Sequence, residues 1–273
     1  MMEVKVMRER VKALICNYVK EYHERENLST KWGEPLVGFA DAKHPLIAEY
    51  KHLIGENHGT PDEVLEDASI VIAYFVPFTK ELAETNKTED DLASREWAVA
   101  YEETNAMFKK LNAYIIEELE KLGYKAGISP KTATFSKTEL KSNWSYRHFA
   151  YLAGLGTFGL NNMLITKKGC CGRYNNIVTN LDVEPDAPLT EELCLYKKNG
   201  SCKVCVNNCP VGALTTEKYD RHLCYTMLMK NAAVHTGLGS SYANEDGKGS
   251  NSKGTDVCGK CVTQSPCAFW NIE

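Results

Sequence analysis

The first apolar positions of the chain recur at the spacing of one helix face. Within residues 2–25, Val11, Ile15 and Tyr22 fall on a single stripe, which predicts an amphipathic helix. Cys16 lies beside this stripe, and we interpret it as a buried structural thiol. The next apolar run, residues 35–40 (PLVGFA), is short and predicts a strand.

A continuous apolar run follows at residues 69–76 (SIVIAYFV). Its β-branched and aromatic side chains, ended by Pro77, predict a buried central strand. Between the two predicted strands, Thr60 is followed by Pro61 and Glu63. This is the form of a helix start with a capping box, so we expect a short helix there.

A second long helix is predicted from about residue 91 to residue 122, after a polar stretch at 79–91 that we expect to be a loop. Gly123 is a suitable stop just past its end. One face of this helix carries apolar side chains: Phe108, Leu111, Ile115 and Leu122. Helices thus alternate with strands, which predicts an α/β layer architecture.

Residues 153–159 (AGLGTFG) contain the letters of a G-x-G-x-x-G motif. They follow helical spacing at 144–153 and precede an apparent strand at 163–166. A dinucleotide fingerprint instead follows a strand and opens a helix, so we reject the nicotinamide interpretation. The glycines either let the backbone turn and approach a bulky group or only end the preceding helix.

Composition allows one large domain, or a core domain with a small module. The chain has 273 residues, 43% of them hydrophobic. No apolar run reaches the ~18 residues that span a membrane, so no membrane partner is expected. No signal-peptide pattern opens the sequence, and we expect a cytoplasmic protein.

Charge is unevenly distributed around a net value of −4. Residues 1–120 carry 14 Lys/Arg and 24 Asp/Glu, whereas residues 121–173 carry nine and one. This basic block could attract a phosphate-bearing cofactor, an anionic substrate, RNA or an acidic redox partner. Alternatively, its lysines only balance the acidic N-terminal part.

Cysteines dominate the end of the chain. Residues 202–210 (CKVCVNNCP) keep the last three cysteines and the proline of the bacterial ferredoxin run. Eight cysteines lie in the last 80 residues, the number that two [4Fe–4S] clusters need. Structural zinc is the alternative, because paired C-x2-C motifs also suit zinc. Disulfides are disfavoured in a reducing cytoplasm.

In ferredoxins a short run wraps most of one cluster, and a ligand from elsewhere in the chain completes it. We therefore assign a first cysteine group, Cys194, Cys202, Cys205 and Cys267. The second cysteine group is Cys209, Cys224, Cys258 and Cys261. Adjacent Cys170 and Cys171 are left out of both groups.

The acidic, proline-bearing stretch at 182–192 predicts a boundary. We expect an α/β cofactor- and substrate-binding domain at 1–181 and a double-cluster module at 182–273. Residues 236–256 are rich in Gly, Ser, Asn and Asp, which predicts a long flexible loop, either an insertion or a lid.

The order of these motifs resembles the epoxyqueuosine reductase and reductive dehalogenase group of cobalamin-dependent iron–sulfur proteins. SIVIAYFVPF, AGLGTFGLNNMLIT and the module with CPVGAL carry the resemblance, from about Pro35 to Cys267. It implies a nitroreductase-like first domain that holds base-off cobalamin, and a ferredoxin-like module. One cluster would lie near the cobalt, and the other would relay electrons from a ferredoxin or flavodoxin. A flavin is the less favoured cofactor.

The resemblance also implies site residues. Epoxyqueuosine reductases have an acidic proton donor at the position of Leu140, beside which Glu139 stands. Dehalogenases use a tyrosine with a basic neighbour, which Tyr146 and His148 offer. The catalytic candidates are therefore Glu139, Tyr146 and His148, and the cofactor-binding candidates are Arg147, Gly154, Gly156 and Gly159.

Many epoxyqueuosine reductases continue into a helical-repeat extension that helps to hold tRNA, whereas this sequence ends six residues after Cys267. We accordingly expect a small-molecule substrate ahead of tRNA. The leading hypothesis is a corrinoid-dependent iron–sulfur reductase. The alternatives are a non-catalytic electron-transfer protein and an accessory protein that binds or reduces a corrinoid.

Overall fold

The computed structural model describes residues 2–87, 90–132, 134–136, 138–238 and 254–269. The fold is built on an antiparallel four-stranded sheet in the order β1-β2-β8-β3. The predicted strands at 35–40 and 69–76 appear as β1 (Leu36–Asp41) and β2 (Ile70–Pro77). Every residue of β2 is buried, which confirms its central place.

The other two sheet strands are β8 (Gly172–Thr179) and β3 (Ala126–Gly127). The long strand β8 escapes sequence analysis because Asn175 and Asn176 interrupt its apolar pattern. Both are buried and use their side chains internally: Asn175 accepts from Asn112 at 3.1 Å, and Asn176 accepts from Trp144 at 2.9 Å. Hydrogen bonds to buried partners thus replace the usual apolar residues.

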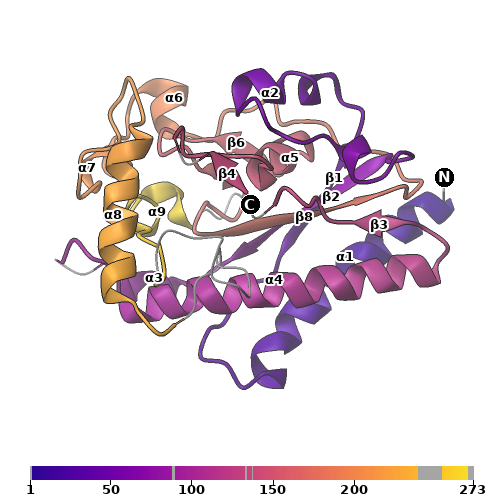
Figure 1. Ribbon diagram of the computed structural model, residues 1–273, viewed down its shortest axis with the longest axis horizontal. Helices are drawn as coiled ribbons and strands as arrows, with labels where there is room; N and C mark the ends of the chain where they lie inside the picture. Colours follow the sequence, from indigo (N-terminus) through magenta and orange to yellow (C-terminus); the bar gives the residue numbers. More distant parts are fainter. Residues whose placement is uncertain (1, 88–89, 133, 137, 239–253, 270–273) are drawn as a thin grey trace.

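Helices cover both faces of the sheet (Figure 1). The two predicted long helices are α1 (Met2–Arg25) and α4 (Arg95–Lys121), which contact each other and share one core with β2. The opposite face is covered by α5 (Tyr146–Leu152), with α2 (Tyr50–Leu53) beyond it. The predicted mixture of helices and strands is confirmed, with an antiparallel sheet.

One local prediction is wrong, and another is correct only in part. The stretch at 79–91 is not all loop, because Thr79 caps a short helix, α3 (Lys80–Thr85), by accepting from the amide of Leu82 at 3.2 Å. Conversely, Thr60 makes no side-chain cap, and Pro61–Glu63 is a single 3₁₀ turn. A capping pattern without a following apolar stripe does not sustain an α-helix.

The C-terminal part contributes short helices at one end of the molecule (Figure 1). They are α6 (Leu195–Asn199), α7 (Val204–Asn207), α8 (Arg221–Val234) and α9 (Lys260–Thr263), followed by a 3₁₀ turn at Pro266–Ala268. Two small hairpins lie between them and the sheet. These are β4 (Phe135–Ser136) with β5 (Lys141–Ser142), and β6 (Gly156–Phe158) with β7 (Leu164–Thr166).

One apolar core contains residues from both sides of the domain boundary predicted at residue 182. It joins Trp97 and Ile165 with Leu193, Val257 and Val262. The segment after β8 is also attached to the sheet, since Asp186 accepts from the amide of Phe39 at 2.9 Å and pairs with Arg8.

The predicted loop at 236–256 falls mostly outside the described residues. Its described ends meet in a bridge between Thr236 and Gly254. Within the described part of the chain, no helix has the length and apolar content needed to cross a membrane.

Candidate functional site

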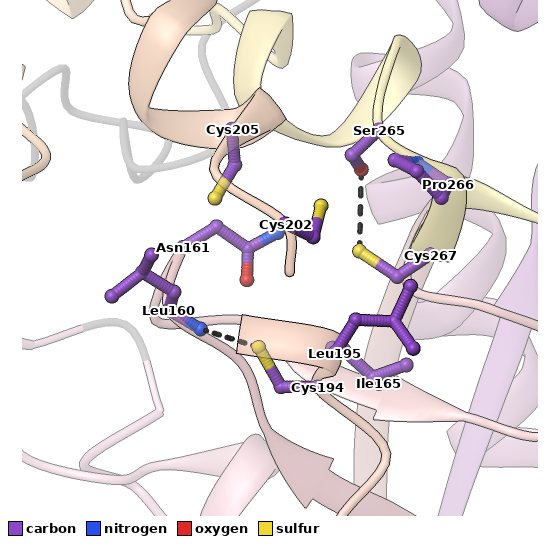
Figure 2. A pocket seen from close by; sticks show the side chains of 10 residues that line it. All are labelled: Leu160, Asn161, Ile165, Cys194, Leu195, Cys202, Cys205, Ser265, Pro266 and Cys267. Atoms are coloured by element: carbon purple, nitrogen blue, oxygen red, sulfur yellow. Dashed lines mark hydrogen bonds between the residues drawn. The ribbon is translucent and has the colours of Figure 1, made fainter. Parts of the chain in front are cut away.

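The first cysteine group surrounds one cavity, although its members come from three separate segments. Cys194 occupies the N-cap position of α6, Cys202 and Cys205 lie at α7, and Cys267 lies in the last 3₁₀ turn. Figure 2 shows these side chains around the cavity, together with Leu160, Asn161, Ile165, Leu195, Ser265 and Pro266. The structure thus brings together the four cysteines that the spacing assigned to one group.

Hydrogen-bond donors approach two sulfurs of this group. The amide of Leu160 lies 3.4 Å from the Sγ of Cys194, and the hydroxyl of Ser265 lies 3.3 Å from the Sγ of Cys267 (Figure 2). Donors of this kind stabilise thiolates and tune iron–sulfur clusters. The site therefore offers thiolate ligands with donors already in place.

The second cysteine group also gathers distant segments. Burial, together with the nearby thiols of Cys224 and Cys209, raises the pKa of Cys258 to about 11. Burial, followed by the thiols of Cys258, Cys224 and Cys209, raises the pKa of Cys261 well above its usual value. The four side chains are therefore close enough to interact. The amide of Ala213 donates to the Sγ of Cys209 at 3.2 Å.

The two groups are adjacent. The thiol of Cys205 is among the charges that raise the pKa of Cys261. Within its own group, burial together with the thiols of Cys267, Cys194 and Cys202 raises the pKa of Cys205 to about 11.

Among the described residues, no three His, Cys, Asp or Glu side chains form a site for a single metal ion. A zinc ion would need its sulfur ligands about 2.3 Å from one centre. A four-iron cluster is a larger body and takes one cysteine at each iron.

One sulfur contact is not predicted by the cysteine spacing. Cys170, which was left out of both groups, lies with its Sγ 3.8 Å from that of Cys267. This hydrogen bond lowers the pKa of Cys267 to about 7, against the raising effect of burial. Adjacent cysteines were the only signal in the sequence, and spacing gave no reason to connect them with residue 267.

The site residues predicted on α5, two catalytic candidates and the cofactor-binding candidate Arg147, each contact the protein's own atoms. The ring of His148 bonds to the Ser145 hydroxyl at 2.6 Å and packs on Phe158, whereas Arg147 donates to the carbonyl of Asn162. Tyr146 is partly buried against the core on the α5 face of the sheet.

Glu139 is exposed, and its carboxylate pairs with Lys141 at 3.3 Å. Its neighbour Leu140, the position at which the resemblance predicts an acidic proton donor, has a φ of 54°. A leucine in this left-handed region is uncommon. The backbone is therefore strained at Leu140, and the neighbouring acid, Glu139, is exposed rather than buried.

The three glycines of residues 153–159 face the protein's own atoms. A Cβ on Gly154 would lie 2.5 Å from the carbonyl oxygen of Ala187, and one on Gly156 would lie 2.0 Å from that of Ile165. A Cβ on Gly159 would lie 2.7 Å from the side-chain oxygen of Asn161. The close approach that the glycines permit is thus internal packing.

Lysines of the basic block pair with acidic residues far away in the sequence. Lys125 bonds to Asp67 at 2.8 Å, Lys131 to Glu63 at 2.7 Å and Lys168 to Glu34 at 2.8 Å. These pairs match the interpretation that the block balances the acidic N-terminal part.

Two histidines at α5, His58 and His148, are shielded from water and neutral at pH 7, and His148 is only partly buried. His58 is fully buried and accepts from the amide of Ser145 through Nε2 at 3.0 Å. Burial lowers the pKa of His58 to about 4 and that of His148 to about 3.

This burial predicts a loss of stability in acid. Below ~6.5, the pKa of a histidine in the unfolded chain, the unfolded chain binds more protons than the folded one. The free energy of unfolding therefore decreases as the pH is lowered, until the pH reaches the pKa values of the two histidines in the folded protein. Each histidine should cost about 2 kcal/mol between pH 6.5 and pH 5. We expect His58→Gln to flatten the pH profile of the free energy of unfolding. The exposed control His222→Gln should not; equal profiles for His58→Gln and wild type would contradict the expectation.

The fold and the two cysteine groups define a class: a mixed α and β protein with two adjacent four-cysteine sites beside its sheet. A curated epoxyqueuosine reductase from Bacillus anthracis is 32% identical over 107 residues, which are 39% of this chain and 24% of that protein. No family model matches the sequence.

Solved structures extend the likeness to nearly the whole chain. Epoxyqueuosine reductase from Bacillus subtilis has a TM-score of 0.55 and 17% identity over 97% of this chain. An epoxyqueuosine reductase with an epoxyqueuosine-modified tRNA stem loop has a TM-score of 0.54 and 17% identity over the same share. This chain covers 66% of each, less than two thirds of their length. The predicted resemblance to epoxyqueuosine reductases is confirmed.

Proposed function

We propose that this protein is an iron–sulfur reductase that carries two [4Fe–4S] clusters, one on each cysteine group. The observation that carries the proposal is the cavity at which Cys194, Cys202, Cys205 and Cys267 meet. The likeness to epoxyqueuosine reductases supports a reductase. The clusters would supply single low-potential electrons, which the protein tunes through burial and hydrogen bonds to sulfur.

Metal analysis tests this proposal. After anaerobic reconstitution we expect about eight iron atoms and eight acid-labile sulfides per chain. Stoichiometric zinc without sulfide would overturn the iron–sulfur assignment and favour structural zinc sites.

An acidic ferredoxin or flavodoxin is the proposed electron donor. Residues 194–234, which hold five of the eight cysteines, carry six Lys/Arg and two Asp/Glu. Lys203 and Lys218 are exposed here, the first of them next to Cys202. Such a basic face steers an acidic partner towards the clusters.

Charge reversal on this face should slow reduction by the donor. For the double variant Lys203→Glu with Lys218→Glu, we expect about tenfold slower reduction by an acidic ferredoxin at low salt, and little difference at high salt. Lys51→Glu on α2 is the matched exposed control. Stopped-flow reduction rates would contradict the proposal if the double variant and the control behaved alike.

A corrinoid is the proposed second cofactor, and its support is the likeness to the family. When bound, it would supply a cobalt centre that reduces or attacks a substrate. Gly154, Gly156 and Gly159 do not fit as its cradle, because the protein's own atoms fill the space beside them. Titration with cobalamin while the clusters are intact tests this part. A base-off spectrum supports it, and no spectral change would favour a flavin or an electron carrier.

Two substrates fit this proposal. The similar structure with a tRNA stem loop favours a modified tRNA, whereas the acid-paired lysines of the basic block favour a small molecule. Binding of tRNA at low salt that weakens steeply as salt rises would support the first. If tRNA did not bind at low salt, a small molecule would remain as the proposed substrate.

A further inference from the structure

One buried thiol outside both cysteine groups lies against a member of the first. Cys170 is fully buried, with its Sγ 3.8 Å from the Sγ of Cys267. The walls of the cavity include Cys267 but not Cys170. Cys170 therefore stands behind Cys267 and does not compete with it for the cavity.

The backbone fixes this approach. The amide of Cys170 donates to the carbonyl of Cys267 at 2.9 Å, and the amide of Cys171 donates to the carbonyl of Ala268 at 3.1 Å. A Cβ on Gly169 would lie 2.1 Å from the Ala268 carbonyl oxygen, so a glycine there allows the two segments to lie this close.

Asn161 orients the thiol of Cys170. Its Nδ2 donates to the Sγ of Cys170 at 3.7 Å, which leaves the S–H proton directed at Cys267. Asn161 is itself held, because its Oδ1 accepts from the amide of Met163 at 3.1 Å. The result is a short chain of donors from Asn161 through Cys170 to Cys267.

We propose that Cys170 is a positioning residue that sets the reduction potential of the cluster on the first cysteine group, through an S–H···S hydrogen bond to Cys267. This inference rests on the proposed function. A reduced cluster carries one more negative charge than an oxidised one. A donor at a ligand sulfur therefore stabilises the reduced form more and raises the potential. The hydroxyl of Ser265 lies 3.3 Å from the same sulfur. A ligand thiolate can only accept, so two donors would act on Cys267.

The test compares three variants of the reconstituted protein in redox titrations followed by electron paramagnetic resonance. Cys170→Ala removes the donor, and we expect one cluster to shift to a more negative midpoint potential with iron and sulfide content unchanged. Cys170→Ser restores an O–H donor, and should recover much of the shift. Cys171→Ala is the matched control, because it removes an equally buried thiol whose sulfur is not the one that contacts Cys267.

The outcomes separate this inference from the proposed function. Wild-type protein without iron and sulfide would overturn both. Intact clusters with the same potential in Cys170→Ala and Cys171→Ala would overturn only the role of Cys170. If Cys170→Ala lost its cluster, recovery in Cys170→Ser would support the donor role, and loss in both variants would contradict it.

Discussion

Cys205→Ala should halve the iron and sulfide content, from about eight to about four of each per chain. The change removes one of the four sulfurs around the cavity and leaves the second cysteine group complete. We expect loss of one cluster signal and of all electron transfer that passes from one group to the other. Iron and sulfide analysis with optical spectroscopy measures the first effect, and donor-dependent turnover the second.

The pairing of cysteines sets the controls for this prediction. Cys209→Ala should remove the other cluster signal, because Cys209 belongs with Cys224, Cys258 and Cys261. Cys16→Ala should leave both clusters intact, since that thiol is half buried near the carbonyl of Pro35, at 3.8 Å. The assignment would be wrong if Cys205→Ala and Cys209→Ala abolished the same signal.

Gly156→Ala should destabilise the protein by about 3 kcal/mol, even though only a methyl group is added. The new Cβ would lie 2.0 Å from the carbonyl oxygen of Ile165 and 2.7 Å from its carbonyl carbon. These are backbone atoms of the paired strand β7, so the β6–β7 hairpin must open to admit it. For a chain of this size the melting temperature should fall by roughly 10 °C.

Gly55→Ala is the matched control for Gly156→Ala. A Cβ there would meet only side-chain carbons of Lys141, at 3.6 Å and 3.7 Å, which is ordinary contact. Thermal unfolding should therefore leave this variant close to wild type. Equal melting temperatures for the two variants would show that the hairpin tolerates a side chain at residue 156.

The sequence was most informative where a single physical pattern dominated. The stripe with Val11 and Ile15 predicted α1, because a helix buried on one face has apolar residues at helical spacing. The apolar run at 69–76 predicted the central strand, because a strand buried on both faces is apolar throughout. The strand β8 shows no such apolar pattern, since it contains Asn175 and Asn176, whose side chains are buried with hydrogen-bond partners. Those partners come from elsewhere in the fold and cannot be seen locally.

At the cysteine groups, too, local sequence patterns were predictive and long-range contacts were not. Cysteine spacing predicted which four sulfurs share the cavity, because ligand runs have a fixed local form. It did not predict Cys170, whose contact with Cys267 joins residues 97 positions apart. Nor did the letters of 153–159 predict that Gly156 faces Ile165, which depends on the pairing of two short strands.

The most direct test of the central claim is electron paramagnetic resonance of the anaerobically reduced, reconstituted protein. Two [4Fe–4S] clusters that meet near Cys205 and Cys261 should give about two spins per chain, with a spectrum broadened by their interaction. Cys205→Ala should simplify it to one cluster with about half the spins. A silent protein that contains zinc, or two signals with no mutual broadening, would contradict adjacent clusters on these two cysteine groups.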